Sequence, residues 1–229
     1  MTMKVQAVLF DMDGVIINSG ADIALSVNAA LEAFGYKTLP EDVLVSFVGN
    51  GAKKLLIRAL EYQNEDAAKM KNFQEFFDWY VDWYRKNPVN KTVLYPGMYA
   101  LLETLREKSV YAAVVSNKPL SVAQKILAHF KIDGFFDAVI GPERLSKIKP
   151  DPEGLALAAR DIEKKHGVRL ERSRIIMVGD SASDIQAGRA FGCITCAVTE
   201  GLGNRETLLE EKADIIVPYA GDLKKVLFS

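Results

Sequence analysis

Two aspartates at the end of a short apolar run are the sequence feature that most limits how this chain can fold and what it can bind. Residues 5–10 read as a buried strand, and Asp11 and Asp13 follow it directly. Side chains at positions i and i+2 of an extended chain point to the same side, so the two carboxylates converge on one spot. Buried carboxylates are unfavourable unless they are paired or bind a cation. Gly14 then permits a sharp turn or the close approach of a ligand. The alternative explanation is a polar strand end followed by an ordinary turn.

Apolar runs alternate with amphipathic stretches over much of the chain, which favours a parallel sheet covered by helices on both faces. We therefore predict an α/β fold whose core is a doubly wound, Rossmann-like parallel sheet. Strands are expected at 5–10, 110–115, 136–140, 175–178, 194–198 and 215–217, and helices at 98–108, 120–130, 152–166 and 184–191.

The stretch after the first strand reads as entirely helical. Helices are expected at 19–34, after Pro40, at 52–62 and at 64–85, and the segment at 87–90 reads as a connector. The aromatic residues of the fourth helix indicate a bundle core, because a platform for stacking nucleic-acid bases needs a basic groove and this region is acidic. We predict a helical cap domain, 18–91, inserted into a discontinuous core, 1–17 and 92–229.

Composition narrows the function classes. The net charge of −1 gives no basic field for nucleic acid, so no nucleic-acid partner is expected. Neither a signal peptide nor an apolar run of about 18 residues is apparent, which predicts a cytoplasmic protein without a membrane partner. Cys193 and Cys196 sit in a buried-looking run, and we interpret them as core residues because strand residues three apart face opposite sides.

Two later strands also end in polar residues. Ser116 and Asn117 follow the strand at 110–115, and Asp180 follows the strand at 175–178. Open α/β sheets bind ligands outside the carboxyl ends of their strands, so three coinciding clusters indicate a site. Ser116 precedes a helix, where free N–H groups and its hydroxyl suit a phosphate. An ordinary helix N-cap is the alternative reading of Ser116.

Three carboxylates at neighbouring strand ends, Asp11, Asp13 and Asp180, would repel one another without a cation. Hard oxygen ligands with open water positions suit Mg²⁺, and no His or Cys cluster favours zinc. Asp184 lies one helical turn after Asp180, although helix capping also explains Asp184 and Ser181.

Lys149 stands before Pro150 and Pro152, which stiffen the loop around it. A rigid lysine can neutralise a carboxylate and a phosphate together. The alternative is a lysine on a surface loop.

These four clusters, in this order, resemble the four motifs of the haloacid dehalogenase-like superfamily, and the helical insertion resembles the cap of those enzymes. The clusters read Asp11-Met12-Asp13-Gly14, Ser116-Asn117-Lys118, Lys149-Pro150 and Gly179-Asp180-Ser181-Ala182-Ser183-Asp184. Within the superfamily, residues 48–52, Arg58 and residues 116–119 look most like the phosphoglycolate phosphatases.

The resemblance implies a reaction through an aspartyl-phosphate. Asp11 would attack phosphorus, and Asp13 would protonate the leaving oxygen and then activate water. Mg²⁺ would bind Asp11, the backbone carbonyl of Asp13 and Asp180. Ser116 and Lys149 would hold the phosphoryl oxygens.

The resemblance also implies supporting roles. Asp184, with Ser181, would orient the groups around the metal and Lys149. Gly14 and Asn117 would offer backbone N–H groups to the substrate. The candidates in the cap for binding a substrate carboxylate are Asn50, Lys53 and Arg58.

The predicted function is a Mg²⁺-dependent phosphomonoester phosphatase, as a monomer or homodimer, whose substrate is a small phosphorylated metabolite, first of all 2-phosphoglycolate. The alternatives are a phosphatase for a sugar phosphate or pyrophosphate, a sugar-phosphate mutase, and a binding module without activity. Val15 and Asn18 depart from the usual phosphoglycolate phosphatase pattern, which weakens the substrate assignment but leaves the chemistry intact.

Overall fold

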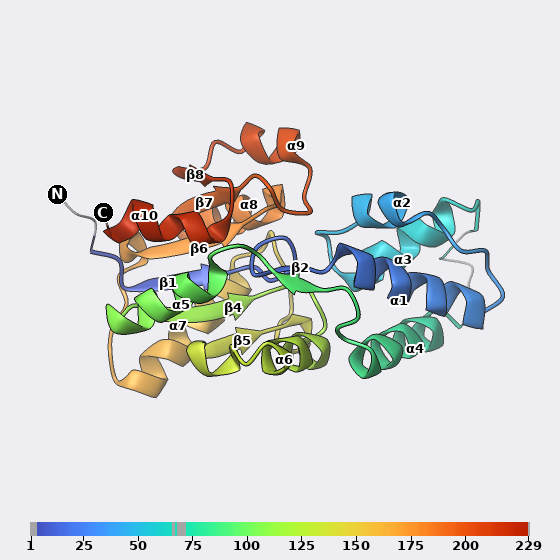
Figure 1. Cartoon of the computed structure of the whole chain (residues 1–229), viewed down its shortest axis with the longest axis horizontal. Helices are drawn as coiled ribbons and strands as arrows, with labels where there is room; N and C mark the ends of the chain where they lie inside the picture. The colour runs from blue at the N-terminus through green and yellow to red at the C-terminus, as the bar shows by residue number, and fades with distance from the viewer. Residues whose placement is uncertain (1–3, 66, 68–71, 229) are drawn as a thin grey trace.

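The computed structural model describes residues 4–65, 67 and 72–228, and in this part of the chain six parallel strands form one sheet (Figure 1). The order across the sheet is β5-β4-β1-β6-β7-β8. The chain runs outward from β1 in one direction to β4 and β5, and in the other to β6, β7 and β8. The carboxyl end of β1 is therefore the point where the strand order reverses, which is where open α/β sheets bind ligands. The strands are β1 (Ala7–Phe10), β4 (Tyr111–Val115), β5 (Ala138–Ile140), β6 (Ile175–Gly179), β7 (Ile194–Val198) and β8 (Ile215–Val217).

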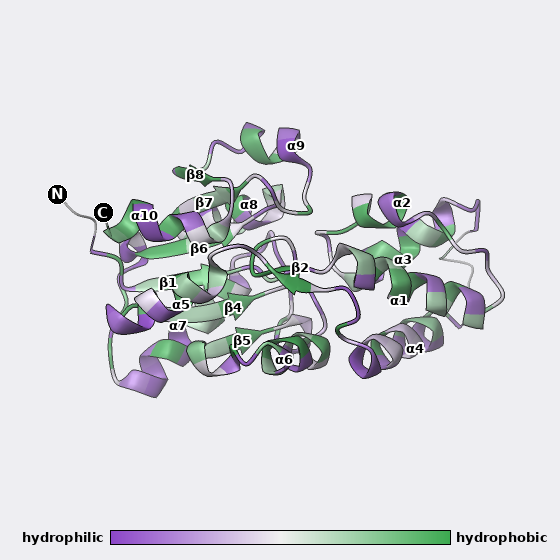
Figure 2. Ribbon diagram, in the orientation of Figure 1, coloured by the Kyte–Doolittle hydropathy of each residue, from purple (hydrophilic) through white to green (hydrophobic). Residues whose placement is uncertain are grey.

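Helices cover both faces of the sheet, as predicted. Ala7 and Leu9 of β1 belong to one hydrophobic cluster with α7 (Glu153–His166) and α8 (Ala182–Phe191). Val8 and Phe10 belong to a second cluster on the opposite face, which includes residues of α5 (Met98–Glu107), α6 (Leu120–His129) and α10 (Leu223–Phe228). Because successive side chains of β1 alternate between two buried faces, its sequence is an unbroken apolar run (Figure 2). A further helix of the core is α9 (Arg205–Glu210).

Four helices stand apart from the layers around the sheet and face one end of it (Figure 1). They are α1 (Gly20–Ala33), α2 (Glu41–Ser46), α3 (Ala52–Glu61) and α4 (Phe73–Lys86). Their apolar sides pack together, with Phe76, Tyr80 and Tyr84 of α4 fully or almost fully buried, so the aromatic stripe is core packing as predicted. The predicted helix at 64–85 falls partly on residues 66 and 68–71, which lie outside the described residues.

Two segments of the chain connect these four helices to the sheet, and they lie side by side. β2 (Ile17–Asn18) pairs antiparallel with β3 (Val93–Leu94). The predicted boundaries after residues 17 and 91 fall at or next to this ribbon, while the division into two domains stays a prediction. Short 3₁₀ turns complete the described elements, at Asp133–Phe135, Pro142–Arg144, Arg172–Arg174 and Ala220–Asp222.

The two cysteines are buried and not joined by a disulfide. Cys193 belongs to the cluster on the α7 and α8 face and Cys196 to the cluster on the other face, so they point away from each other. Burial raises the pKa of each thiol to about 12, which suits core residues rather than reactive ones. In the described part of the chain, no helix is long and apolar enough to cross a membrane.

Candidate active site

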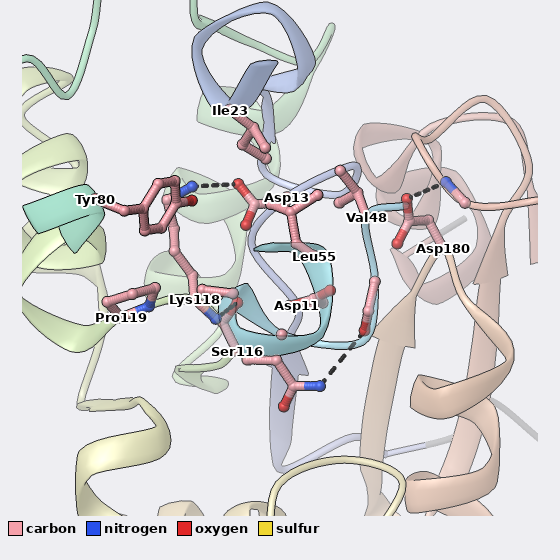
Figure 3. A pocket seen from close by; sticks show the side chains of 15 residues that line it. Asp11, Asp13, Ile23, Val48, Leu55, Tyr80, Ser116, Lys118, Pro119 and Asp180 are labelled. Atoms are coloured by element: carbon pink, nitrogen blue, oxygen red, sulfur yellow. Dashed lines mark hydrogen bonds and ion pairs between the residues drawn. The ribbon is translucent and has the colours of Figure 1, made fainter. Parts of the chain in front are cut away.

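The polar residues that end β1, β4 and β6 line one cavity of about 50 Å³ between the sheet and the helices α1–α4 (Figure 3). Asp11, Asp13, Ser116, Asn117 and Asp180 all contribute to its wall, so the residues predicted at three strand ends do meet. The opposite wall is mostly apolar. It is lined by Ile23, Val48, Gly49, Gly51, Ala52, Leu55 and Tyr80.

Asp11 is fixed at the end of β1 and has its carboxylate in the cavity wall. Its backbone N–H donates to the carbonyl of Val178 on β6 at 2.9 Å. Its Oδ1 lies 2.9 Å from Lys149 Nζ as an ion pair, but among the described residues this buried oxygen has no hydrogen bond of acceptable geometry. Burial raises the pKa of Asp11 to about 6; the nearby Lys149 opposes the shift, while Asp184 and Asp13 add to it.

Lys149 is a buried cation held by three residues. Its Nζ donates to Asp184 Oδ1 at 2.6 Å in addition to pairing with Asp11. Asn117 secures its backbone, because Asn117 Oδ1 accepts from the Lys149 N–H at 3.2 Å and Nδ2 donates to the Lys149 carbonyl at 3.3 Å. Burial lowers the pKa of Lys149, but Asp11 and Asp184 outweigh burial and the pKa is raised. Lys149 is therefore not a surface loop residue.

Asp180 sits in a cradle of glycines and backbone amides. Its Oδ2 accepts from the N–H groups of Leu202 at 2.7 Å and Gly203 at 2.8 Å. A Cβ added to Gly14 would lie 1.8 Å from that same oxygen, and Gly14 has φ +83°. Burial raises the pKa of Asp180 well above its usual range, and Asp11 and Asp184 add to this effect. Backbone amides thus fix Oδ2 of the buried Asp180 carboxylate, and its Oδ1 remains available to bind another partner.

Asp184 and Ser181 form a capping box at the start of α8. Asp184 Oδ2 accepts from the Ser181 N–H at 3.1 Å and from the Ser181 hydroxyl at 2.6 Å. The helix consequently starts at Ala182, two residues earlier than the sequence pattern predicts. Asp184 therefore has both of the expected roles: it caps α8 with one carboxylate oxygen and accepts a hydrogen bond from Lys149 with the other.

Asp13 lies on the opposite side of the cavity from Asp180 (Figure 3). Its Oδ1 accepts from the hydroxyl of Ser19 and from Lys118 Nζ, the latter at 2.9 Å. The Lys118 ammonium also donates to Tyr84 Oη at 2.7 Å. Lys118 stands inside the Ser116-Asn117-Lys118 motif, but no local pattern assigns it a role, because its partner Tyr84 lies 34 residues away on α4.

The residues predicted to bind substrate do not all face this cavity. The Gly14 N–H donates to the Ile17 carbonyl at 2.9 Å, so it is occupied within the turn and the predicted free donor is wrong. Asn50, Lys53 and Arg58 are absent from the described lining. Lys53 Nζ lies over the Phe77 ring at 5.2 Å, and Arg58 donates to the Phe47 carbonyl at 3.1 Å.

Comparison with known proteins identifies the family to which a chain with this fold and this site belongs. The model of the haloacid dehalogenase-like hydrolase family matches residues 8–198. The chain belongs to this family. It is 35% identical over 233 residues to the phosphoglycolate phosphatase of Haemophilus influenzae, covering 99% of this chain and all of that protein. It is 36% identical to the phosphoglycolate phosphatase of Pasteurella multocida, covering 90% of each chain.

A solved structure of a predicted phosphoglycolate phosphatase from Haemophilus somnus matches the fold with a TM-score of 0.85. That protein is 30% identical, and the match covers 97% of this chain and 98% of the other. This haloacid dehalogenase-like hydrolase is accordingly a phosphoric monoester hydrolase of the phosphoglycolate phosphatase-like kind. The resemblance found in the sequence motifs is confirmed.

The carboxylates of this hydrolase fit a divalent cation. One oxygen each of Asp11, Asp180 and Asp184 lies within 4.8 Å of the others, and all three residues are buried. Asp11 Oδ1 accepts no hydrogen bond of acceptable geometry from the described residues, so it can coordinate a cation. Among the described residues around the cavity, the four carboxyl groups of Asp11, Asp13, Asp180 and Asp184 face only the two ammonium groups of Lys118 and Lys149, so two negative charges lack a local counter-charge when all four carboxyl groups are ionised. Oxygen ligands and this imbalance suit Mg²⁺.

Proposed function

We propose that this hydrolase is a Mg²⁺-dependent phosphatase that converts 2-phosphoglycolate and water to glycolate and phosphate. The observation that carries the proposal is the shared cavity, where Asp11, Asp13 and Ser116 meet Asp180 beside an unbalanced negative charge. Its volume of about 50 Å³ is small, which argues against a bulky phosphate ester as the substrate. The phosphoglycolate phosphatases of similar sequence over the full chain support the choice of substrate.

In the first half-reaction, a carboxylate oxygen of Asp11 attacks phosphorus. The bond between phosphorus and the ester oxygen breaks, and Asp13 gives its proton to that oxygen, so glycolate leaves. The Ser116 hydroxyl and the Lys149 ammonium bind the phosphoryl oxygens and stabilise the charge that develops on them. Asn117 keeps the lysine in place through its backbone contacts.

In the second half-reaction, water attacks the phosphorus of the aspartyl-phosphate. Asp13, now ionised, takes a proton from the water, and the bond between phosphorus and Asp11 breaks, which restores the carboxylate of Asp11 and the protonated form of Asp13. The apolar wall opposite the strand ends, with Val48, Ala52 and Leu55, excludes other water from the cavity.

Asp11 and Asp180 would hold Mg²⁺, together with the backbone carbonyl of Asp13. The ion would supply positive charge between the attacking carboxylate and the phosphoryl group. Asp184 and the capping Ser181 orient Lys149 and the groups around the ion. Mg²⁺ would also lower the pKa of Asp11 from about 6, and so keep this carboxylate ionised for attack.

The cytoplasmic location, the monomer or homodimer, and the absence of nucleic-acid and membrane partners stay predictions from the sequence. A role of Asn50, Lys53 or Arg58 in binding the leaving group also stays a prediction from the sequence.

The test is phosphate release from 2-phosphoglycolate, a hexose 6-phosphate and pyrophosphate, each with Mg²⁺ and with EDTA. We expect release that depends on the metal and is fastest for 2-phosphoglycolate. Faster release from one of the other compounds would refute the substrate, and equal release with EDTA would refute the metal requirement. Transfer of the phosphoryl group to another position of the sugar would identify a mutase.

A further inference from the structure

Lys118 is a buried cation that the proposed mechanism leaves without a task. It follows β4 in the core, is 5% exposed, and reaches Asp13 and the helix α4 with its ammonium group (Figure 3). Burying an ammonium group is unfavourable without partners, and the two partners it has lie on two different parts of the chain. Among the described residues that line the cavity, Lys118 is the one with a cationic side chain.

The position of Lys118 relative to the leaving group follows from its contact with Asp13. Asp13 must lie next to the ester oxygen to protonate it, and Lys118 Nζ lies 2.9 Å from Asp13 Oδ1. In 2-phosphoglycolate the carboxylate is carried by the carbon atom that bears this ester oxygen. A cation beside Asp13 is therefore within reach of that carboxylate.

The other described residues that line the cavity offer no positive charge to the carboxylate of 2-phosphoglycolate. The wall formed by the helices α1–α4 contributes mostly apolar side chains, including Ile23, Val48 and Leu55. The core wall contributes Asp11, Asp13 and Asp180, which repel an anion. Buried anions need a counter-charge, and Lys118 supplies it at the end of the cavity where the leaving group lies.

Tyr84 on α4 holds the ammonium group in this place. Its Oη accepts a hydrogen bond from Lys118 Nζ at 2.7 Å, and Nζ lies 4.3 Å from the centroid of its ring. Tyr84 is fully buried, so its ring is fixed by the packing of α4. The contacts to Asp13 and Tyr84 use two of the three N–H donors of Lys118, and the third can bind substrate.

We propose that Lys118 recognises the carboxylate of the leaving group and thereby selects phosphomonoesters that carry an anionic group one carbon from the ester oxygen. Tyr84 is a positioning residue that acts through Lys118. The proposal rests on the proposed function, since it names the group that would choose the substrate of that site.

The test compares 2-phosphoglycolate with ethyl phosphate, which has a methyl group in place of the carboxylate. For Lys118→Met we expect the ratio of kcat/KM for 2-phosphoglycolate to kcat/KM for ethyl phosphate to fall roughly 10- to 100-fold, as for loss of a charged hydrogen bond. Loss of the contact with Asp13 slows both substrates alike, and the ratio removes this common effect. Lys118→Arg should keep the ratio within a few-fold of wild type.

The matched control is Lys125→Met, which removes an exposed lysine of α6 that does not line the cavity. We expect an unchanged ratio. Tyr84→Phe should lower the ratio by a smaller factor than Lys118→Met and act mainly on KM for 2-phosphoglycolate. If Lys118→Met does not fold, Lys118→Gln keeps a side chain of similar length for the same comparison.

An unchanged ratio in the folded Lys118 variant, or an equal fall of the ratio in Lys125→Met, would overturn the proposal. Calorimetry measures the affinity of 2-phosphoglycolate for Asp11→Asn and for the double variant Asp11→Asn, Lys118→Met. This comparison tests the role of Lys118 in binding without relying on turnover, so its failure can be told apart from a failure of the proposed function. If wild type releases no phosphate from either compound, the phosphatase proposal fails. Equal affinity of the two Asp11→Asn proteins, or no binding to either, would then refute the role of Lys118 as well.

Discussion

The carboxylate of Asp180 determines which residues can stand around it. A Cβ at Gly201 would lie 2.4 Å from Asp180 Cβ, and one at Gly203 would lie 2.1 Å from the Asp180 carbonyl oxygen. Gly14 and the neighbouring pair Gly201 and Gly203, from two distant parts of the sequence, must therefore lack side chains so that Asp180 can be buried and hydrogen-bonded. The glycine that the sequence pattern singles out next to Asp13 serves this packing, rather than donating its N–H to substrate.

Gly14→Ala should damage the site beyond the effect of backbone strain. The new Cβ would overlap Asp180 Oδ2 at 1.8 Å, so the carboxylate must move. We expect kcat/KM to fall at least roughly 10-fold, on the scale of a lost hydrogen bond to a charged group, with a lower Tm. The control is Gly35→Ala, which has nearly the same φ, +81°, but nothing within 4 Å of its Cβ. That variant should cost only about 1–2 kcal/mol of stability, with unchanged kinetics. Equal kinetics of the two variants would show that Asp180 tolerates a side chain at position 14.

At the scale of elements, Asp22 ties the start of α1 to the returning chain just before β3. Its buried carboxylate accepts hydrogen bonds from the N–H groups of Asn90, Lys91 and Thr92 and from the Thr92 hydroxyl, at 2.6–3.1 Å. Burial raises the pKa of Asp22, but these hydrogen bonds outweigh burial and the pKa lies below 3.8. The two crossings of the chain are thus fastened to each other beside the β2–β3 ribbon.

Asp22→Asn should destabilise the protein by about 2–3 kcal/mol at neutral pH, because it replaces a charged acceptor of several hydrogen bonds. Between the pKa of the folded state and that of the unfolded state, 3.8, the folded protein binds fewer protons at Asp22. Its contribution is therefore complete above that range and is lost as the pH falls through it. Urea unfolding of wild type and variant from pH 7 to pH 3 measures this difference. Asp42→Asn, an exposed residue of α2, is the control and should change stability little. A difference that grows toward low pH would contradict the assignment.

The strands of the main sheet and most of the helices could be predicted from the sequence because each carries a local pattern, whereas the short β2–β3 ribbon and the helices α9 and α10 are not predicted by it. The strand at 175–178 was found within one residue, and Asp11, Ser116 and Asp180 were expected together because the strands are parallel. The contact of Lys118 with Tyr84 could not be predicted, since it depends on how α4 packs beside the loop after β4. The amides of Leu202 and Gly203 were missed for a similar reason, because nothing local to them marks a carboxylate 22 residues earlier as their partner.

At the scale of the whole molecule, the site lies where the sheet meets the four helices α1–α4, and it carries more negative than positive charge. The carboxylates of Asp11, Asp180 and Asp184 come together only because β1, β6 and α8 are packed side by side. Like charges at this meeting point oppose folding unless they are neutralised. A bound cation would therefore stabilise the entire fold as well as serve the reaction.

Mg²⁺ should raise the Tm of the protein measured in EDTA, independently of substrate. At 100 times the Kd, a ligand that binds only the folded state adds about 2.7 kcal/mol to the free energy of unfolding. Asp180→Asn should abolish most of this shift, because it removes a charged ligand from the cluster. Asp161→Asn, which removes a half-exposed ion pair with Arg144, should keep the full shift. A shift of the same size in both variants would place the metal elsewhere.

The central claim is that Asp11 accepts the phosphoryl group, and it can be tested by quenching the reaction in acid. Wild-type protein mixed briefly with Mg²⁺ and 2-phosphoglycolate should yield a peptide in which Asp11 carries one phosphoryl group, as found by mass spectrometry. Asp11→Asn should yield no such peptide and less than roughly one thousandth of the turnover, as when a nucleophile is removed. A phosphoryl group on a different residue, or full turnover by Asp11→Asn, would contradict the account.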